Sequence, residues 1–133
     1  MKKAIIFLGL ALGMGLVQAQ YTYKLRVSEW SCTLNAGGVM VAEGTVINQS
    51  GQTLSNIRIN LRVTDKEVTM VNGVPNRRVY GTNSAPIAVH TLANKASSRF
   101  EVQVKPTQSR NVQCQIWFRS PDMVQIPTRV PGQ

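Results

Sequence analysis

The side chains of this chain that are best suited to chemistry are cationic and aromatic. Arg58 and Arg62 lie in a run that alternates apolar and polar residues, and Trp117 and Arg119 lie in a second such run. Alternate residues of a strand share one face, so we expect Arg58 and Arg62 to point outward together, about 13 Å apart. An exposed indole beside a guanidinium can stack on a sugar or a base, or anchor a protein partner. These four residues are therefore candidates for contact with an anionic or protein partner.

The sequence leaves two arrangements of this surface open. If Arg99, Lys105 and Arg119 lie on the same sheet face, they complete a basic platform around Trp117. In the alternative, a loop or the C-terminal tail covers Trp117, and the indole serves only in packing. The choice depends on which strands are neighbours, and local alternation says nothing about that.

The overall charge favours anionic partners. The chain carries 15 Lys and Arg against 6 Asp and Glu, a formal net charge of +9. Such a balance suits nucleic acid, acidic polysaccharide, lipid head groups or an acidic protein, and it serves solubility equally well. The basic residues are scattered; after residue 20, Arg77-Arg78 is their only adjacent pair, beside Tyr80 in the irregular stretch 65–86. Arg77 and Arg78 are candidate anion contacts on a loop, with a solvated loop as the alternative.

A catalytic constellation is not expected. His90 is the only histidine, and it lies in the stretch 88–92, which is typical of a strand or strand end. A hydrolytic triad needs such a base beside a nucleophile and an orienting carboxylate. The only closely spaced acids, Asp65 and Glu67, follow a predicted strand, where acidic residues normally face solvent. We therefore expect a non-enzymatic protein with no catalytic residue, no metal and no cofactor.

The first 19 residues have the pattern of a secretion signal. Met1-Lys2-Lys3 supplies a short positive segment, an apolar run extends from Ala4 to Val17, and Val17-Gln18-Ala19 suits signal peptidase. The run is shorter than the roughly 20 apolar residues of a membrane-spanning helix. We therefore expect cleavage after residue 19 and export of residues 20–133 to the periplasm or the exterior, as a soluble chain without a transmembrane span.

Cys32 and Cys114 are the only two cysteines. In an exported protein such a pair most simply forms one disulfide. A redox-active pair is the alternative, but catalytic cysteines usually stand close together as C-x-x-C, a motif that this chain lacks. Zinc is disfavoured because the cysteines are isolated and only one histidine is present.

Period-two alternation recurs along residues 20–120, whereas helical periodicity is almost absent. The expected inward-facing residues are Leu25 and Val27; Ile57, Ile59, Leu61 and Val63; Phe100, Val102 and Val104; and Val112, Cys114, Ile116 and Phe118. Short strands about ten residues apart, separated by turn residues such as Asn72-Gly73, are typical of an antiparallel sandwich. We expect an all-β, immunoglobulin-like sandwich of about seven strands over 20–120, followed by a Pro-rich extended tail over 121–133.

The stretch Gly44 to Asp65 resembles the FxLYD and CARDB-like group of bacterial immunoglobulin-like domains. In that group a strand with the pattern G-x-V-x-N is followed by a small polar turn and then by T-L-x-N-V-x-V. Here residues 44–48 are Gly-Thr-Val-Ile-Asn, and residues 53–59 are Thr-Leu-Ser-Asn-Ile-Arg-Ile. The eponymous motif falls on residues 61–65, where only Asp65 agrees. The resemblance implies an exported seven-strand sandwich that serves as a binding or spacer module, and it carries over no catalytic residue.

These observations favour a non-catalytic, exported binding or scaffold domain of the bacterial cell envelope with a protein partner. The first alternative is a basic module for an anionic polymer (DNA, polysaccharide or lipid-linked glycan), which requires the basic side chains to converge and makes binding salt-sensitive. The second is a structural subunit of a surface fibre, which needs an exposed strand edge or a donor segment. The prolines of 121–133 make that tail a poor donor. The oligomeric state stays open.

Overall fold

The computed structural model describes residues 22–133, and every regular element among them is a β-strand. The expected secretion signal, 1–19, lies outside the described residues. These strands form two main sheets of four strands each. The strand order of the first sheet is β10 (Ser97–Val104), β3 (Met40–Asn48), β2 (Leu25–Leu34) and β13 (Thr128–Arg129). The strand order of the second sheet is β12 (Met123–Ile126), β11 (Val112–Ser120), β5 (Arg58–Asp65) and β8 (Val79–Pro86). Two short ribbons, β4 (Leu54–Ser55) with β9 (Thr91–Leu92) and β6 (Thr69–Val71) with β7 (Val74–Asn76), lie outside these sheets.

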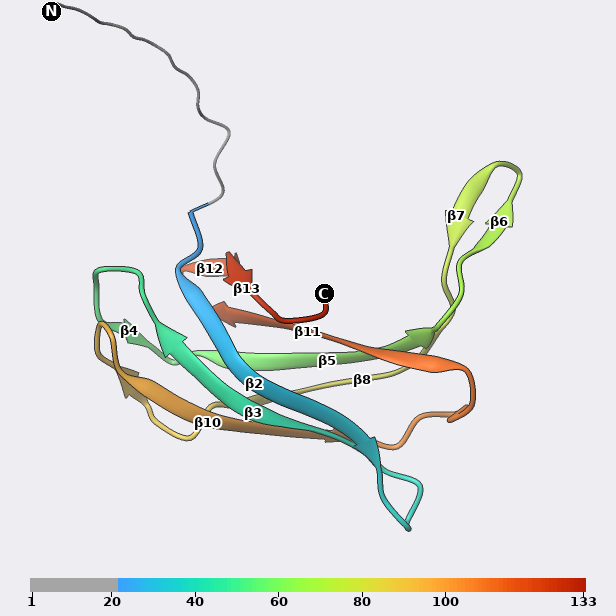
Figure 1. Ribbon diagram of the computed structural model, residues 1–133, viewed down its shortest axis with the longest axis horizontal. Coiled ribbons are helices and arrows are strands. Elements are labelled where there is room, and N and C mark those ends of the chain that lie inside the picture. The colour runs from blue at the N-terminus through green and yellow to red at the C-terminus, as the bar shows by residue number, and fades with distance from the viewer. Residues whose placement is uncertain (1–21) are drawn as a thin grey trace, which may run out of the picture.

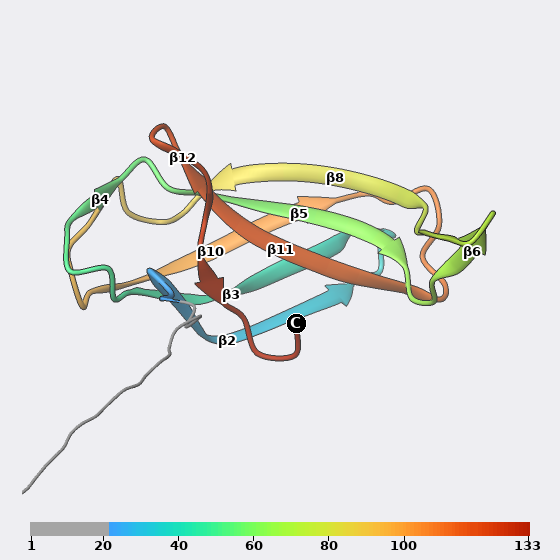
Figure 2. The ribbon, with the colours of Figure 1, turned by 90° about the horizontal axis from the view of Figure 1, so that it is seen from above.

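The two sheets form two layers (Figures 1 and 2), and the cluster of buried apolar side chains lies between them. Ile59, Leu61 and Val63 of β5 are fully buried, as the alternation predicts. Phe118 of β11 meets Phe100 of β10 edge to face, with ring centroids 5.3 Å apart, so the core joins strands of both sheets. The arginines at alternate positions of β5 must therefore point away from the core.

The path of the chain confirms the expected immunoglobulin-like fold. Strands β2 and β3 form an antiparallel hairpin in the first sheet, and the chain then crosses to β5 and β8 in the second sheet. It returns to the first sheet as β10, continues with β11 and β12 in the second, and ends in the first with the short β13. This order corresponds to strands A-B-E facing C-F-G, with β8 as an added neighbour of strand C. Among the described residues the two sheets contain eight strands; the seven longer ones are β2, β3, β5, β8, β10, β11 and β12, and the eighth is the two-residue β13.

A bulge shapes the β2–β3 hairpin. The register shifts between Val27 and Glu29, so the extra residue lies on β2. Gly44 faces the bulge from β3, and a Cβ there would clash with the Glu29 carbonyl oxygen and lie 2.8 Å from the Cα of Trp30. Glycine at position 44 is thus required by the close approach of the neighbouring backbone.

The polar turn after β3 is organised by one buried amide. Asn48 is fully buried. Its Nδ2 donates to the carbonyl oxygens of Gln52 (2.7 Å) and Leu92 (2.9 Å), and its Oδ1 accepts from the Ser50 N–H (2.9 Å). Asn48 therefore satisfies backbone groups of two loops, and its role in the stretch 46–66 is structural.

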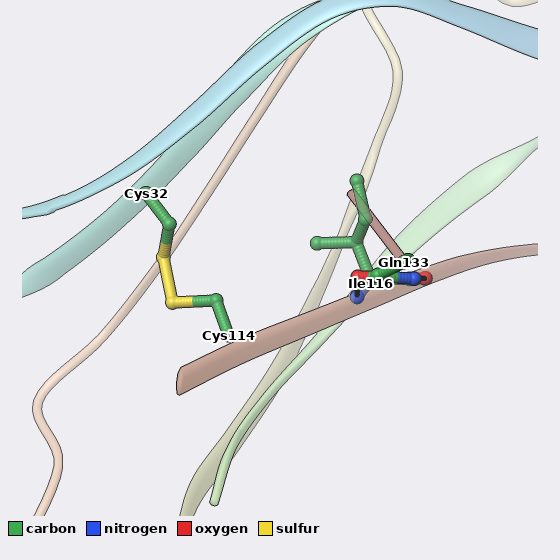
Figure 3. Close-up of a disulfide and its surroundings, with 4 residues drawn as sticks. All are labelled: Cys32, Cys114, Ile116 and Gln133. Carbon is green, nitrogen blue, oxygen red and sulfur yellow. Dashed lines mark hydrogen bonds between the residues drawn. A yellow bond between two sulfur atoms is a disulfide. The ribbon is translucent and has the colours of Figure 1, made fainter. Parts of the chain in front are cut away.

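The predicted disulfide is confirmed. Cys32 of β2 and Cys114 of β11 are bonded; their Cα atoms are 6.4 Å apart, and the two residues are separated by 82 positions in sequence (Figure 3). Because β2 belongs to the first sheet and β11 to the second, the bond ties the two layers together along one side of the sandwich.

The segment 121–133, expected as an extended tail, contributes strands to both sheets. β12 pairs with the end of β11, the chain turns at Pro127, and β13 pairs in parallel with β2. Ile126 is 1% exposed and belongs to the core. The prolines permit this because Pro121, Pro127 and Pro131 all lie outside the strands, where no ladder N–H is needed.

The β6–β7 hairpin projects from one end of the sandwich (Figure 1). Its turn residues, Asn72 and Gly73, have φ values of 52° and 78°, as the Asn-Gly dipeptide predicts. Met70 is 60% exposed and Val74 is 62% exposed. Within residues 22–133 the structure contains no helix of sufficient length and apolarity to cross a membrane.

Candidate anion-binding face

The register of β5 and β11 brings the predicted contact residues together on the outer face of the second sheet. Arg58 lies opposite Arg119, Asn60 opposite Trp117, and Arg62 opposite Gln115. Residues directly across an antiparallel pair share one face, with Cβ atoms about 5 Å apart. We call this set the arginine face; its members are Arg58, Asn60, Arg62, Gln115, Trp117 and Arg119.

Trp117 lies at the centre of the arginine face. The guanidinium carbon of Arg62 lies 5.1 Å from the centroid of the indole, and Arg62 Nε donates to Gln115 Oε1 at 3.2 Å. This stacking orients the Arg62 charge over the aromatic ring. Trp117 is half-buried rather than covered, so the tail leaves part of the indole accessible.

Two polar hollows adjoin Trp117. One, of about 350 Å³, is lined by Trp117 together with Arg62, Gln125 and Gln133. The other, of about 580 Å³, lies between Trp117 and the tail residues 128–133. The amide side chains here offer both donors and acceptors, which suits hydroxyl-bearing or charged groups more than an apolar ligand.

A smaller cavity lies where Arg58 faces Arg119. Its volume is about 220 Å³, and its lining includes both arginines, Pro86 and Pro121. Arg58 Nη2 donates to Ser84 Oγ at 3.2 Å, and Arg119 Nε donates to Asn60 Oδ1 at 3.3 Å. Both partners are neutral, so neither contact neutralises the two positive charges.

Asn60 supports this arrangement from below. It is 9% exposed, and its Oδ1 holds Arg119. Its Nδ2 is buried without a hydrogen-bond partner. An unsatisfied buried donor costs about 1–3 kcal/mol.

The acidic residues lie elsewhere. The ion pairs found in residues 22–133 join Arg99 to Glu29 (3.2 Å) and to Glu43 (3.6 Å), on the outer face of the first sheet. The condition for a platform that includes Arg99 is therefore not met: Arg99 belongs to β10, in the opposite layer, and is already paired with acids. Within the described part of the chain, no carboxylate forms an ion pair with the arginine face.

Arg77 and Arg78 are not part of the arginine face. Both lie at the Asp65 end of β5, about 23 Å along the strand from Arg58. Arg78 donates its backbone N–H to Asp65 Oδ2 at 3.0 Å, and Tyr80 donates its hydroxyl to Asp65 Oδ1 at 2.5 Å. The Tyr80 hydrogen bond, followed by the Arg78 N–H, lowers the pKa of Asp65, and the same carboxylate raises the pKa of Tyr80. This cluster anchors the base of the hairpin.

His90 lies just before β9 and is exposed. Its backbone carbonyl accepts from the Asn56 N–H at 2.9 Å. No hydrogen bond or ion pair joins its ring to a carboxylate among the described residues. Residues 22–133 also contain no group of three or more His, Cys, Asp and Glu side chains that is close enough to hold a metal ion.

No protein-family model and no curated protein matches this sequence. Among solved structures, the chain is similar to the archaellum periplasmic stator protein FlaG from Sulfolobus acidocaldarius, with a TM-score of 0.40 and 16% identity over 78% of this chain and 95% of that chain. It is also similar to DesR, a β-glucosidase from Streptomyces venezuelae, with a TM-score of 0.37 and 10% identity over 77% of this chain and 15% of that chain. Likenesses of this strength do not bear on what the protein does.

Proposed function

We propose that this chain is a non-catalytic binding module of the bacterial envelope that engages an anionic polymer through the arginine face. The observation that carries the proposal is the convergence of Arg58, Arg62 and Arg119 beside Trp117, with no carboxylate of the described residues paired to them. A row of guanidinium groups attracts a polyanion, and an aromatic platform adds stacking that tolerates different bases or sugars.

Export to the envelope is part of the same proposal. The Cys32–Cys114 disulfide is typical of proteins that fold in an oxidising compartment, such as the periplasm or the exterior. The N-terminal pattern of residues 1–19 predicts the same destination. Export would give the module access to surface polysaccharide, lipid-linked glycan and extracellular DNA, which are the polyanions of that compartment.

The test is a salt titration of binding. Residues 20–133 are mixed with a DNA duplex and, separately, with an acidic polysaccharide, and affinity is measured at several salt concentrations. We expect a linear fall of the logarithm of affinity with the logarithm of salt. The double variant Arg62→Gln/Arg119→Gln should reduce the slope for DNA by about 2.

A matched control is available away from the arginine face. Arg26 of β2 and Arg110, between β10 and β11, are exposed and line neither of the hollows beside Trp117. The variant Arg26→Gln/Arg110→Gln removes the same charge, and it should leave affinity within about twofold. Equal losses in the two double variants would show that only net charge matters and would refute the proposed face.

A protein partner is the second candidate, and the β6–β7 hairpin favours it. Met70 and Val74 expose apolar side chains on a projecting ribbon, and exposed apolar surface is typical of protein contact sites. Retention of an envelope protein at high salt by the parent, but not by a Met70→Ser/Val74→Ser variant, would support this alternative.

A further inference from the structure

We propose that the cavity between Arg58 and Arg119 binds a single oxyanion group, a phosphate or a carboxylate, of the anionic partner. The inference rests on the proposed function and adds to it a defined subsite at one end of the arginine face. The recognised chemistry is that of a compact group with several acceptor oxygens.

The first argument is charge. Arg58 and Arg119 are directly opposed on neighbouring strands, and like charges in that position destabilise a sheet. Another facing pair shows how this chain relieves such repulsion: Glu43 lies opposite Glu101, and Arg99 bonds Glu43 at 3.6 Å. On the arginine face, no carboxylate of the described residues forms an ion pair with Arg58 or Arg119. A bound anion would supply the negative charge that balances the two arginines.

The second argument is the supply of donors. A guanidinium has five N–H donors in a fixed fork, which matches the oxygens of phosphate and carboxylate. The hydrogen bonds to Ser84 and Asn60 occupy one nitrogen of each arginine. These two contacts hold the side chains in place and leave the other N–H groups for a ligand.

The third argument is shape. The cavity of about 220 Å³ has two prolines in its lining, Pro86 at the end of β8 and Pro121 after β11. Proline has a fixed φ, so these walls are rigid. The volume suits one compact group and not a polymer segment, and the rest of the partner would extend along β5 toward Arg62 and Trp117.

A second pair of opposed arginines, Arg26 and Arg129, lacks the features that define the proposed subsite. These residues also face each other, at the edge of the first sheet. Neither has a hydrogen bond that orients its guanidinium among the contacts of residues 22–133. Two opposed positive charges are therefore not sufficient for the proposed subsite. The subsite also requires that hydrogen bonds orient both guanidinium groups and that a cavity lies between them.

The experiment is thermal unfolding of residues 20–133 with inorganic phosphate, glucose 6-phosphate or glucuronate, each compared with sodium chloride at equal ionic strength. A ligand that binds only the folded state raises Tm, and we expect a rise of about 5 °C at a concentration about tenfold above Kd. Arg58→Gln and Arg119→Gln should each abolish the rise, and Arg119→Lys, which keeps the charge but loses the fork, should at least halve it.

The same variants separate lost binding from failed folding. Each glutamine substitution removes one of two opposed charges but also one hydrogen bond, to Ser84 or to Asn60, so the two effects oppose each other and the ligand-free Tm should change by only a few degrees. The control Arg26→Gln/Arg129→Gln should keep the full rise. A response to the phosphates alone would support a phosphate-bearing partner, and a response to glucuronate alone would support an acidic polysaccharide.

Two outcomes would overturn the subsite. One is an unchanged Tm of the parent protein with all three compounds; the other is an equal loss of the response in the control. Neither outcome would refute the proposed binding of an anionic polymer, because binding through Arg62 and Trp117 does not need the cavity. The salt titration tests that binding separately. Loss of polymer binding with retained phosphate binding would instead refute the wider function and keep the subsite.

Discussion

The side-chain amide of Gln133 bonds both backbone groups of Ile116. Its Oε1 accepts from the Ile116 N–H at 2.9 Å, and its Nε2 donates to the Ile116 carbonyl oxygen at 3.2 Å (Figure 3). The amide thus completes the edge of β11 beyond the point where β12 pairs with it. Together with the bond from Trp30 Nε1 to the Pro131 carbonyl oxygen at 2.9 Å, it holds the tail across the side of the sandwich.

Gln133→Glu should destabilise the fold. A carboxylate can accept from the Ile116 N–H but cannot donate to its carbonyl, so the expected loss is about 1 kcal/mol in the free energy of unfolding. Urea unfolding measures it. Gln125→Glu, an equal change of charge on exposed β12, is the control and should cost less than half as much. Equal effects would show that the Gln133 pairing contributes nothing.

Removing the disulfide should lower stability by more than any single hydrogen bond. The chain-entropy argument gives about 4–5 kcal/mol for a loop of this size, with strain in the native state reducing the figure. We expect Cys32→Ala/Cys114→Ala to lower Tm strongly while the pattern of strand signals in circular dichroism is kept at low temperature. An unchanged Tm would mean that the bond does not form in the protein.

The hydrogen bond between Tyr80 and Asp65 predicts that the stability of the fold decreases at both acidic and alkaline pH, which gives its contribution an acid limit and an alkaline limit. The pKa of Asp65 lies below its ordinary 3.8, so its contribution to stability is present above that pH and is lost as pH falls through the lowered pKa. The pKa of Tyr80 lies above its ordinary 10.0, so its contribution is complete below that pH and is lost as pH rises through the raised pKa.

Tyr80→Phe should therefore raise the pKa of Asp65, remove the alkaline limit and weaken the acid limit, which the Arg78 N–H still maintains in part. Carboxyl chemical shifts in an NMR titration report the pKa directly. Comparing urea unfolding of the parent and the variant from acid to alkaline pH gives the stability difference, which should be greatest between the two limits. An Asp65 pKa that is identical in the two proteins would contradict the assigned cause.

Trp117→Ala should weaken polymer binding without altering its salt dependence. Stacking on an aromatic side chain contributes about 1–3 kcal/mol per base, so the expected loss is about 5- to 150-fold at fixed salt. Arg62→Gln should instead reduce the salt slope by about 1, because it removes one phosphate contact. A changed slope in the Trp117 variant would mean that the indole acts mainly by orienting Arg62.

Local alternation predicted most of the side chains that are buried and most of those that point outward. Ile59, Leu61 and Phe118 are buried, and Arg62 and Arg119 are exposed, as the period of two requires. The period depends only on the backbone geometry of a single strand, so it needs no knowledge of neighbouring strands. The Cys32–Cys114 bond was equally predictable, because two cysteines allow one pairing.

The membership of the sites was less predictable. Arg99 has the same outward pattern as Arg119, yet it lies in the opposite layer and pairs with Glu29 and Glu43. Asn60 showed the outward pattern too, but its burial and unsatisfied Nδ2 depend on side chains from β11 and β8. Pro86 and Pro121, recognised only as breaks in strands, line the cavity because their strand ends meet in space.

The sequence by itself determined the strands that alternate clearly, most of their two faces, the turns and the cysteine pair, because these follow from local backbone geometry and simple counting. Only the tertiary structure decided that Arg58 faces Arg119, that Trp117 lies under Arg62, and that the tail joins both sheets. Such contacts depend on strand order and register, and these are set by packing the whole core, where one residue of slip would turn every side chain to the other face.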